Sequence, residues 1–144
     1  ERVGAITFVT ANADEAKRVT SQLKRTIRTN YSSPSSHGGQ IVALVLGTAE
    51  LRNKWHAELG YMRARIQQMR TLFVQRLAAR GIQRDFSFIE QQRGMFSYSG
   101  LELEKVRRLR SEFGLYLVDS GRICIAAMNE HNLDSITEAI AKVL

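Results

Sequence analysis

The chain has few of the residues that build disulfide frameworks or metal centres. Its 144 residues include a single cysteine, Cys124, which lies inside an apolar run. A disulfide framework and a cysteine-based metal cluster are therefore not expected, and a reducing, cytoplasmic location is the simplest interpretation. The histidines His37, His56 and His131 share no ligand spacing and have no cysteine partner, so we expect them at the surface.

Long hydrophobic runs and secretion signals are missing as well. No apolar stretch approaches the roughly 18–20 residues of a membrane-spanning helix, and no signal peptide is visible, so no membrane partner is expected. Gly38 and Gly39 lack the spacing and the lysine of a phosphate-binding loop. The only proline, Pro34, lies among serines in a polar segment that we interpret as a loop. Nothing around these serines resembles the nucleophile turn of a hydrolase.

Positive charge, by contrast, is abundant. The formal net charge is +7, and the chain contains 16 arginines and 5 lysines. This balance raises the hypothesis of a non-catalytic module that binds nucleic acid. The helix arginines, however, alternate with apolar positions and are not grouped beside aromatic residues that could stack on bases. We therefore interpret the following residues as a solvated helix face: Arg63, Arg65, Arg70, Arg76, Arg107, Arg108 and Arg110.

Apolar periodicity divides the chain into short elements and one long helix. Strands are predicted at residues 3–10, 86–89, 95–99, 115–118 and 123–127, and shorter helices at residues 12–30, 40–46, 101–113 and 132–144. Asn12 and Glu15 resemble a capping box at the start of the first helix. Apolar residues from Leu51 to Leu77, spaced by three and four, predict a helix of about 45 Å. Such a helix bridges two bodies or joins a coiled coil, and alternating strands and helices indicate an α/β fold.

Three arginines differ from the rest because each lies at the end of a predicted element. Arg2 precedes the first strand, Arg28 lies near the end of the first helix, and Arg122 follows the turn formed by residues 119–121 and opens an apolar strand. An ion pair at the end of a strand or helix would account for any one of them. Together they suggest a ligand with several anionic groups, because a guanidinium binds a carboxylate or phosphate through two parallel hydrogen bonds.

Four segments together resemble the class I aspartate and aromatic aminotransferases. They are ERVGA with Arg2, IRTNYSSP with Arg28, RGMFSYSG with Phe96, and SGRICIAAMN with Arg122. They keep their order and relative spacing, and the resemblance runs along the whole chain. It implies the pyridoxal-phosphate transferase (aspartate aminotransferase) fold. Residues 1–61 would be the end of the large cofactor-binding domain, and residues 62–144 the C-terminal small α+β domain, joined to it by the long helix.

The resemblance also implies the roles of individual residues. Arg2 would pair with the phosphate of pyridoxal 5'-phosphate, and Arg122 would hold the α-carboxylate of the amino acid. Arg28 would reach the neighbouring subunit's site in a homodimer and hold the side-chain carboxylate of aspartate or glutamate. Phe96 would lie beside the bound substrate. The implied reaction exchanges amino groups between aspartate, or an aromatic amino acid, and 2-oxoglutarate.

One expected residue has no counterpart in the sequence. The catalytic lysine of these enzymes, which forms a Schiff base with the cofactor, belongs to a segment upstream of ERVG. None of the five lysines lies in a matching context, so we expect the lysine in a missing N-terminal part and this chain alone to be inactive. Two alternatives stay open: a basic nucleic-acid-binding module and an interaction domain built on the long helix.

Overall fold

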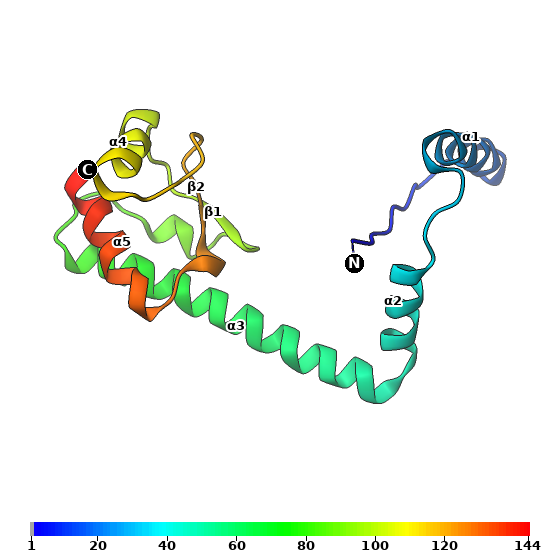
Figure 1. The fold of residues 1–144 in the computed structure, drawn as a ribbon, viewed down its shortest axis with the longest axis horizontal. Helices are drawn as coiled ribbons and strands as arrows, with labels where there is room; N and C mark the ends of the chain where they lie inside the picture. Colours follow the sequence, from blue (N-terminus) through cyan, green and yellow to red (C-terminus); the bar gives the residue numbers. More distant parts are fainter. Residues whose placement is uncertain (1) are drawn as a thin grey trace. The chain divides into compact units, whose positions relative to one another are not determined.

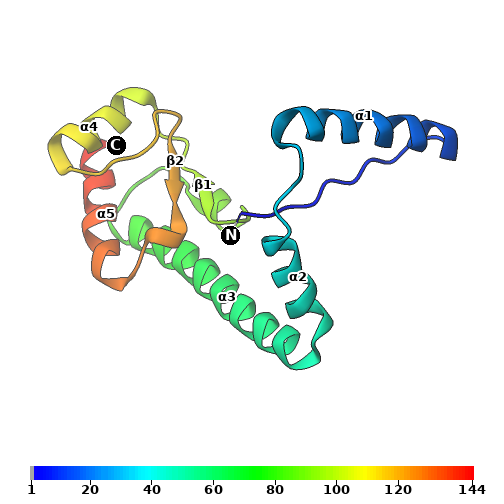
Figure 2. The same cartoon turned by 45° about the vertical axis from the view of Figure 1, so that its right-hand side comes forward.

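The computed structural model describes residues 2–144, which fall into two compact units, one ending at Ala57 and the other covering residues 58–144. The elements follow the order α1, α2, α3, η1, β1, α4, β2, η2 and α5 (Figures 1 and 2). Helix α3 (Ala49–Ala79) confirms the predicted long helix; it begins in the first unit and ends in the second. No helix within residues 2–144 is both long and apolar enough to cross a membrane.

The first unit contains two helices, α1 (Ala13–Tyr31) and α2 (His37–Gly47), and the start of α3. Helix α1 begins as predicted, because the Asn12 side chain accepts a hydrogen bond from the backbone nitrogen of Glu15 at 2.9 Å. The Glu15 carboxylate accepts in return from the backbone nitrogen of Ala11, at 2.8 Å. Helix α2 confirms the second predicted helix, although it begins at His37 and not at residue 40.

Residues 3–10 do not form the strand that we predicted. The segment has no regular secondary structure, and Ile6 and Val9 are 76% and 95% exposed. A strand requires hydrogen bonds to a neighbouring strand, and the only sheet in the described part of the chain pairs β1 with β2. The apolar, β-branched composition therefore predicted a strand for which residues 2–144 contain no partner.

The second unit has one hydrophobic core. It is built from the C-terminal half of α3, helices α4 (Leu103–Phe113) and α5 (Glu130–Val143), and the antiparallel strands β1 (Phe96–Tyr98) and β2 (Arg122–Cys124). Both predicted helices are confirmed, and α4 ends at Gly114 in the left-handed conformation. The strands are shorter than predicted, since η2 (Ile125–Ala127) replaces the end of the second. Fully buried core residues include Phe73, Ile89, Val106, Leu109 and Ile125.

Two other strand predictions in this unit are wrong. Residues 87–89 form the 3-10 turn η1 (Ser87–Ile89), because the Asp85 carboxylate accepts from the Ser87 backbone nitrogen at 2.7 Å and from its hydroxyl at 2.8 Å. This side-chain bonding lowers the pKa of Asp85. Residues 115–118 pair with no strand among those described; Leu115 and Leu117 pack against the core, while Tyr116 is 83% exposed.

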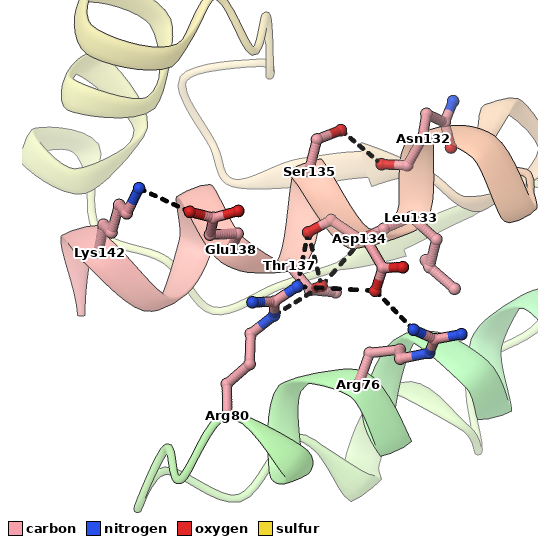
Figure 3. Close-up of polar contacts among 9 residues, drawn as sticks. All are labelled: Arg76, Arg80, Asn132, Leu133, Asp134, Ser135, Thr137, Glu138 and Lys142. Atoms are coloured by element: carbon pink, nitrogen blue, oxygen red, sulfur yellow. Dashed lines mark hydrogen bonds and ion pairs between the residues drawn. The ribbon is translucent and has the colours of Figure 1, made fainter.

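Two arginines near the end of α3 bind α5. We had expected Arg76 to face solvent, and Arg80 carried no prediction. Arg76 Nη1 lies 2.6 Å from the Asp134 carboxylate, and Arg80 donates to the hydroxyl of the buried Thr137 at 3.1 Å and to the Asp134 carbonyl at 2.9 Å (Figure 3). The side chains of Arg76 and Asp134 are 50% and 57% exposed, so this ion pair adds little to the free energy of unfolding. These contacts fix the orientation of one helix on the other.

Candidate functional site

Two of the four predicted site residues, Phe96 and Arg122, lie together in the second unit. In the β1–β2 register Tyr98 is opposite Arg122 and Phe96 is opposite Cys124. Alternate residues of a strand share a face, so Phe96 and Arg122 are diagonal neighbours on the exposed face, while Ser97 and Ile123 point to the core. The Arg122 guanidinium carbon lies 4.8 Å from the centre of the Phe96 ring, in cation–π distance.

The Arg122 guanidinium is available to an anion. The nearest acidic residue in sequence is Asp119, in the turn that leads into β2, and its carboxylate accepts from Arg110 Nη2 at 2.7 Å. Arg110 also donates to the Leu117 carbonyl at 2.9 Å, which holds the turn in place. Arg122 itself forms no ion pair with any residue in 2–144. The acidic residue of the turn is therefore bound elsewhere, and the guanidinium keeps its donors for a ligand.

A cavity of about 250 Å³ adjoins this pair. Its lining is mainly apolar, with Arg122 as its one charged residue; it includes Phe96, Leu117, Cys124, Asn132 and Ile136. The Asn132 side chain is already used, because it closes the capping box of α5 with Asn129 and donates to the Ala127 carbonyl at 3.1 Å. A small apolar cavity with one free guanidinium suits an organic anion whose carboxylate meets the arginine.

A larger cavity of about 680 Å³ lies elsewhere in the second unit and contains none of the predicted site residues. It is lined by residues of α3 and of the segment 90–95, including four arginines, Arg63, Arg65, Arg70 and Arg93, and one carboxylate, Glu90. By volume alone, this cavity would be the candidate for the substrate-binding site. The smaller one is the better candidate for substrate binding because it combines an unpaired guanidinium with an aromatic wall.

Gly121 sets the position of Arg122. It has φ of 78°, and an added Cβ would lie 2.8 Å from the Leu101 carbonyl oxygen. We expect Gly121→Ala to lower the free energy of unfolding by about 3 kcal/mol, combining left-handed backbone strain with overpacking. Gly114→Ala is the matched control, since Gly114 has φ of 64° and open space around it, and we expect a cost of about 1 kcal/mol. Thermal unfolding followed by circular dichroism checks this; equal shifts would contradict the close-contact explanation.

The other two predicted residues, Arg2 and Arg28, lie in the first unit. Arg2 is exposed in the irregular segment. Arg28 is exposed in the last turn of α1, where its carbonyl accepts from the Ser32 nitrogen at 3.1 Å as the helix ends. Neither side chain has a hydrogen bond or ion pair within residues 2–144, so both guanidinium groups are free for anionic ligands. Their roles stay predictions.

Two further residues, Arg65 and Arg70, were missed by the sequence reasoning, which placed them on a solvated face. Arg70 is only 5% exposed and bonds to residues around β1, while Arg65 bonds to carbonyls that follow β2. Burial, with a smaller effect of the nearby Arg93, lowers the pKa of Arg70. The signal was present: Arg70 lies four residues after Ile66 and three before Phe73, which places it on the apolar stripe of α3.

Comparison with known proteins defines the class. The family described as aminotransferase class I and II matches residues 1–140. An aspartate aminotransferase of Pseudomonas aeruginosa is 58% identical over 144 residues, covering 100% of this chain and 36% of that protein. An aromatic-amino-acid aminotransferase of Escherichia coli is 46% identical with the same coverage.

Solved structures agree with the sequence relatives. A crystal structure of an aromatic-amino-acid aminotransferase from Burkholderia pseudomallei, covalently bound to pyridoxal phosphate, superposes with a TM-score of 0.86 at 62% identity, covering 94% of this chain and 34% of that one. The chain belongs to the class I and II aminotransferases, with the pyridoxal-phosphate transferase fold that the four segments implied. It spans about a third of the length of the relatives that it matches, 36% of each of the first two.

Proposed function

We propose that the intact protein is a pyridoxal-phosphate-dependent aminotransferase that exchanges the amino group between aspartate, or an aromatic amino acid, and 2-oxoglutarate. The observation that supports this most is the free Arg122 guanidinium stacked over Phe96 in the lining of a mainly apolar cavity, in a chain of this family. Relatives named for aspartate and for aromatic amino acids both occur among the matches, which supports both substrate classes.

Arg122 is proposed to bind the α-carboxylate of the substrate. A guanidinium stays charged at every pH at which the enzyme works and forms two parallel hydrogen bonds to a carboxylate. The Phe96 ring beneath it limits the directions in which the guanidinium can turn, and the cavity beside it is lined mainly by apolar residues. Fixing the carboxylate at one end orients the amino group of the substrate, which accelerates the reaction through positioning.

Arg2 is proposed to bind the phosphate of the cofactor. Its exposed guanidinium, free of partners within residues 2–144, has the charge and the planar donor set that a phosphate dianion requires. When bound, pyridoxal 5'-phosphate supplies an electron sink for the carbon that loses its proton. The lysine that would bind it covalently is proposed to lie outside residues 1–144.

Arg28 is proposed to act across a homodimer, in the neighbouring subunit's site, on the second carboxylate of aspartate, glutamate or 2-oxoglutarate. Its position in the last turn of α1, exposed and without an ionic partner in the described chain, leaves it free to do so. We also propose that residues 1–61 complete a large domain and residues 62–144 form a small one. A cytoplasmic location remains our expectation.

The nucleic-acid alternative is weakened by the contacts of the helix arginines. Arg65, Arg70, Arg76 and Arg80 of α3 donate hydrogen bonds to groups inside the second unit, which leaves fewer of their donors for a nucleic acid. No observation on this chain favours a nucleic-acid role over substrate binding.

The proposed function is tested by assaying the purified intact protein with 2-oxoglutarate and, in turn, aspartate, phenylalanine and tyrosine. We expect glutamate to form from 2-oxoglutarate with at least one of these donors, and to depend on added pyridoxal 5'-phosphate after the cofactor is stripped. Failure of all three donors in cofactor-saturated protein would overturn the proposal.

A further inference from the structure

Two arginines of the long helix hold the strands of the Phe96–Arg122 site. On β1, Arg70 Nε donates to Ser97 Oγ at 3.2 Å, and its Nη2 donates to the Gly94 and Phe96 carbonyl oxygens, at 2.5 and 3.4 Å. Beyond β2, Arg65 donates to the Ala126 carbonyl at 3.2 Å and to the Met128 carbonyl at 2.7 Å. One guanidinium of α3 thus binds β1 and the residue Gly94 before it, and another binds the segment that follows β2.

The guanidinium of Arg70 is expensive to keep at this position. The residue is 5% exposed and forms no ion pair with any residue in 2–144, and its guanidinium donates to three neutral oxygens. Burying a charge with only neutral partners is costly, and an apolar side chain would extend the stripe formed by Met69 and Phe73 without that cost. A buried charge at such a position suggests that it sets geometry and not stability.

Arg70 and Phe96 meet on opposite sides of the same strand. Ser97, whose hydroxyl accepts from Arg70, is 2% exposed and points to the core, while the Phe96 ring points to the exposed face and contacts Arg122. Arg70 also binds the carbonyl of Phe96 itself. The contact therefore fixes the backbone that carries the ring, and the ring in turn limits the guanidinium of Arg122.

We propose that Arg70 is a positioning residue of the carboxylate site: by holding the backbone at residues 94–97 it sets the Phe96 ring, and through the ring the Arg122 guanidinium. Arg65 supports the same pair from the end of β2. This inference rests on the proposed function, because it adds a residue to the site that the proposal assigns to the substrate carboxylate. Arg70 touches neither substrate nor cofactor in this account.

The kinetic consequence is a change in KM. We expect Arg70→Met to raise KM for the amino-acid substrate by roughly tenfold with a smaller change in kcat, because carboxylate binding is weakened before and during reaction alike. Arg70→Lys keeps the charge and can still donate to one of the acceptors, but it lacks the planar guanidinium. We therefore expect about a threefold rise in KM. Arg76→Met is the matched control, since Arg76 lies on the same helix but pairs with Asp134 of α5.

A fluorine label tests the inference independently of catalysis. In the intact protein, 4-fluorophenylalanine is placed at position 96 only, and its ¹⁹F resonance is compared among wild type, Arg70→Met, Arg76→Met and Arg122→Met. We expect the Arg70→Met resonance to move from the wild-type position toward that of Arg122→Met, and the Arg76→Met resonance to stay. An unmoved resonance in Arg70→Met, or an equal displacement in Arg76→Met, would overturn the inference.

The test stays decisive in two foreseeable cases. Where Arg70→Met does not fold, the ¹⁹F resonance is measured in Arg70→Lys and Ser97→Ala, since each removes only part of the contact. If the resonance stays at the wild-type position in both variants, the inference is rejected. Where the wild type fails to transaminate, the proposed function is lost but the fluorine shifts still decide whether Arg70 sets the position of the ring.

Discussion

Replacing Arg122 by alanine in the intact protein is expected to lower kcat/KM by roughly 10²–10³-fold for aspartate, phenylalanine and tyrosine alike, the loss typical of one partner of a hydrogen-bonded charge pair. All three amino acids carry an α-carboxylate, and Arg122 is the charged residue that lines the smaller cavity. Steady-state kinetics with each donor, at saturating 2-oxoglutarate, measures the effect.

Two control variants test whether the loss of kcat/KM comes from the guanidinium of Arg122. Arg122→Lys keeps the positive charge but loses the planar guanidinium and its stacking on Phe96. We therefore expect a kcat/KM between those of Arg122→Ala and the wild type. Arg108→Ala removes an arginine of α4 whose partner is Glu112, and should leave kcat/KM unchanged. A loss in Arg122→Ala confined to aspartate would assign the residue to the side-chain carboxylate and contradict the account.

Replacing Arg28 by alanine is expected to discriminate between substrates. For aspartate and glutamate, kcat/KM should fall by about 10²-fold, because the second carboxylate would lose the guanidinium proposed to bind it. For phenylalanine and tyrosine the change should stay within roughly threefold, since their side chains present no carboxylate. Arg25→Ala, one turn earlier on α1 and equally exposed, is the matched control. Equal losses for dicarboxylic and aromatic donors would remove the role proposed for Arg28.

The same two variants test the dimer. If Arg28 serves the neighbouring subunit's site, a hybrid of one Arg28→Ala subunit and one Arg122→Ala subunit contains one site with both arginines intact. Random reassociation of equal amounts should then restore about a quarter of the wild-type activity toward aspartate, since about half of the dimers are hybrids with one working site each. If both arginines serve their own subunit, mixing restores nothing.

The helices of this chain were predictable because the signals that form them are local. The Asn12 cap, the glycine at position 114 and the spacing of apolar residues in α3 act within a turn or two of the helix, and the structure has helices where they indicate. Strands depend on a partner distant in sequence. Residues 3–10 and 115–118 have strand composition but no paired strand among the described residues, and the predictions there were wrong.

Two residues of the candidate site could be singled out from the sequence, but the contacts that support them could not. Phe96 and Arg122 were singled out from short segments, and in the structure the guanidinium carbon of Arg122 lies 4.8 Å from the centre of the Phe96 ring. Arg65 and Arg70 were assigned to solvent because their partners, Met128 and Ser97, lie 63 and 27 residues away along the chain. A buried arginine whose acceptors are mostly backbone carbonyls carries no residue pattern that would reveal them, so only its place on the apolar stripe gave a clue.

The central claim, that this chain is part of an aminotransferase that carries pyridoxal 5'-phosphate, is tested most directly by mass spectrometry of the intact protein after borohydride reduction and digestion. We predict a reduced pyridoxyl group on one lysine of the protein, and unmodified peptides for Lys17, Lys24, Lys54, Lys105 and Lys142. A protein saturated with cofactor that carries no pyridoxyl lysine, or one modified at any of these five residues, would contradict the account.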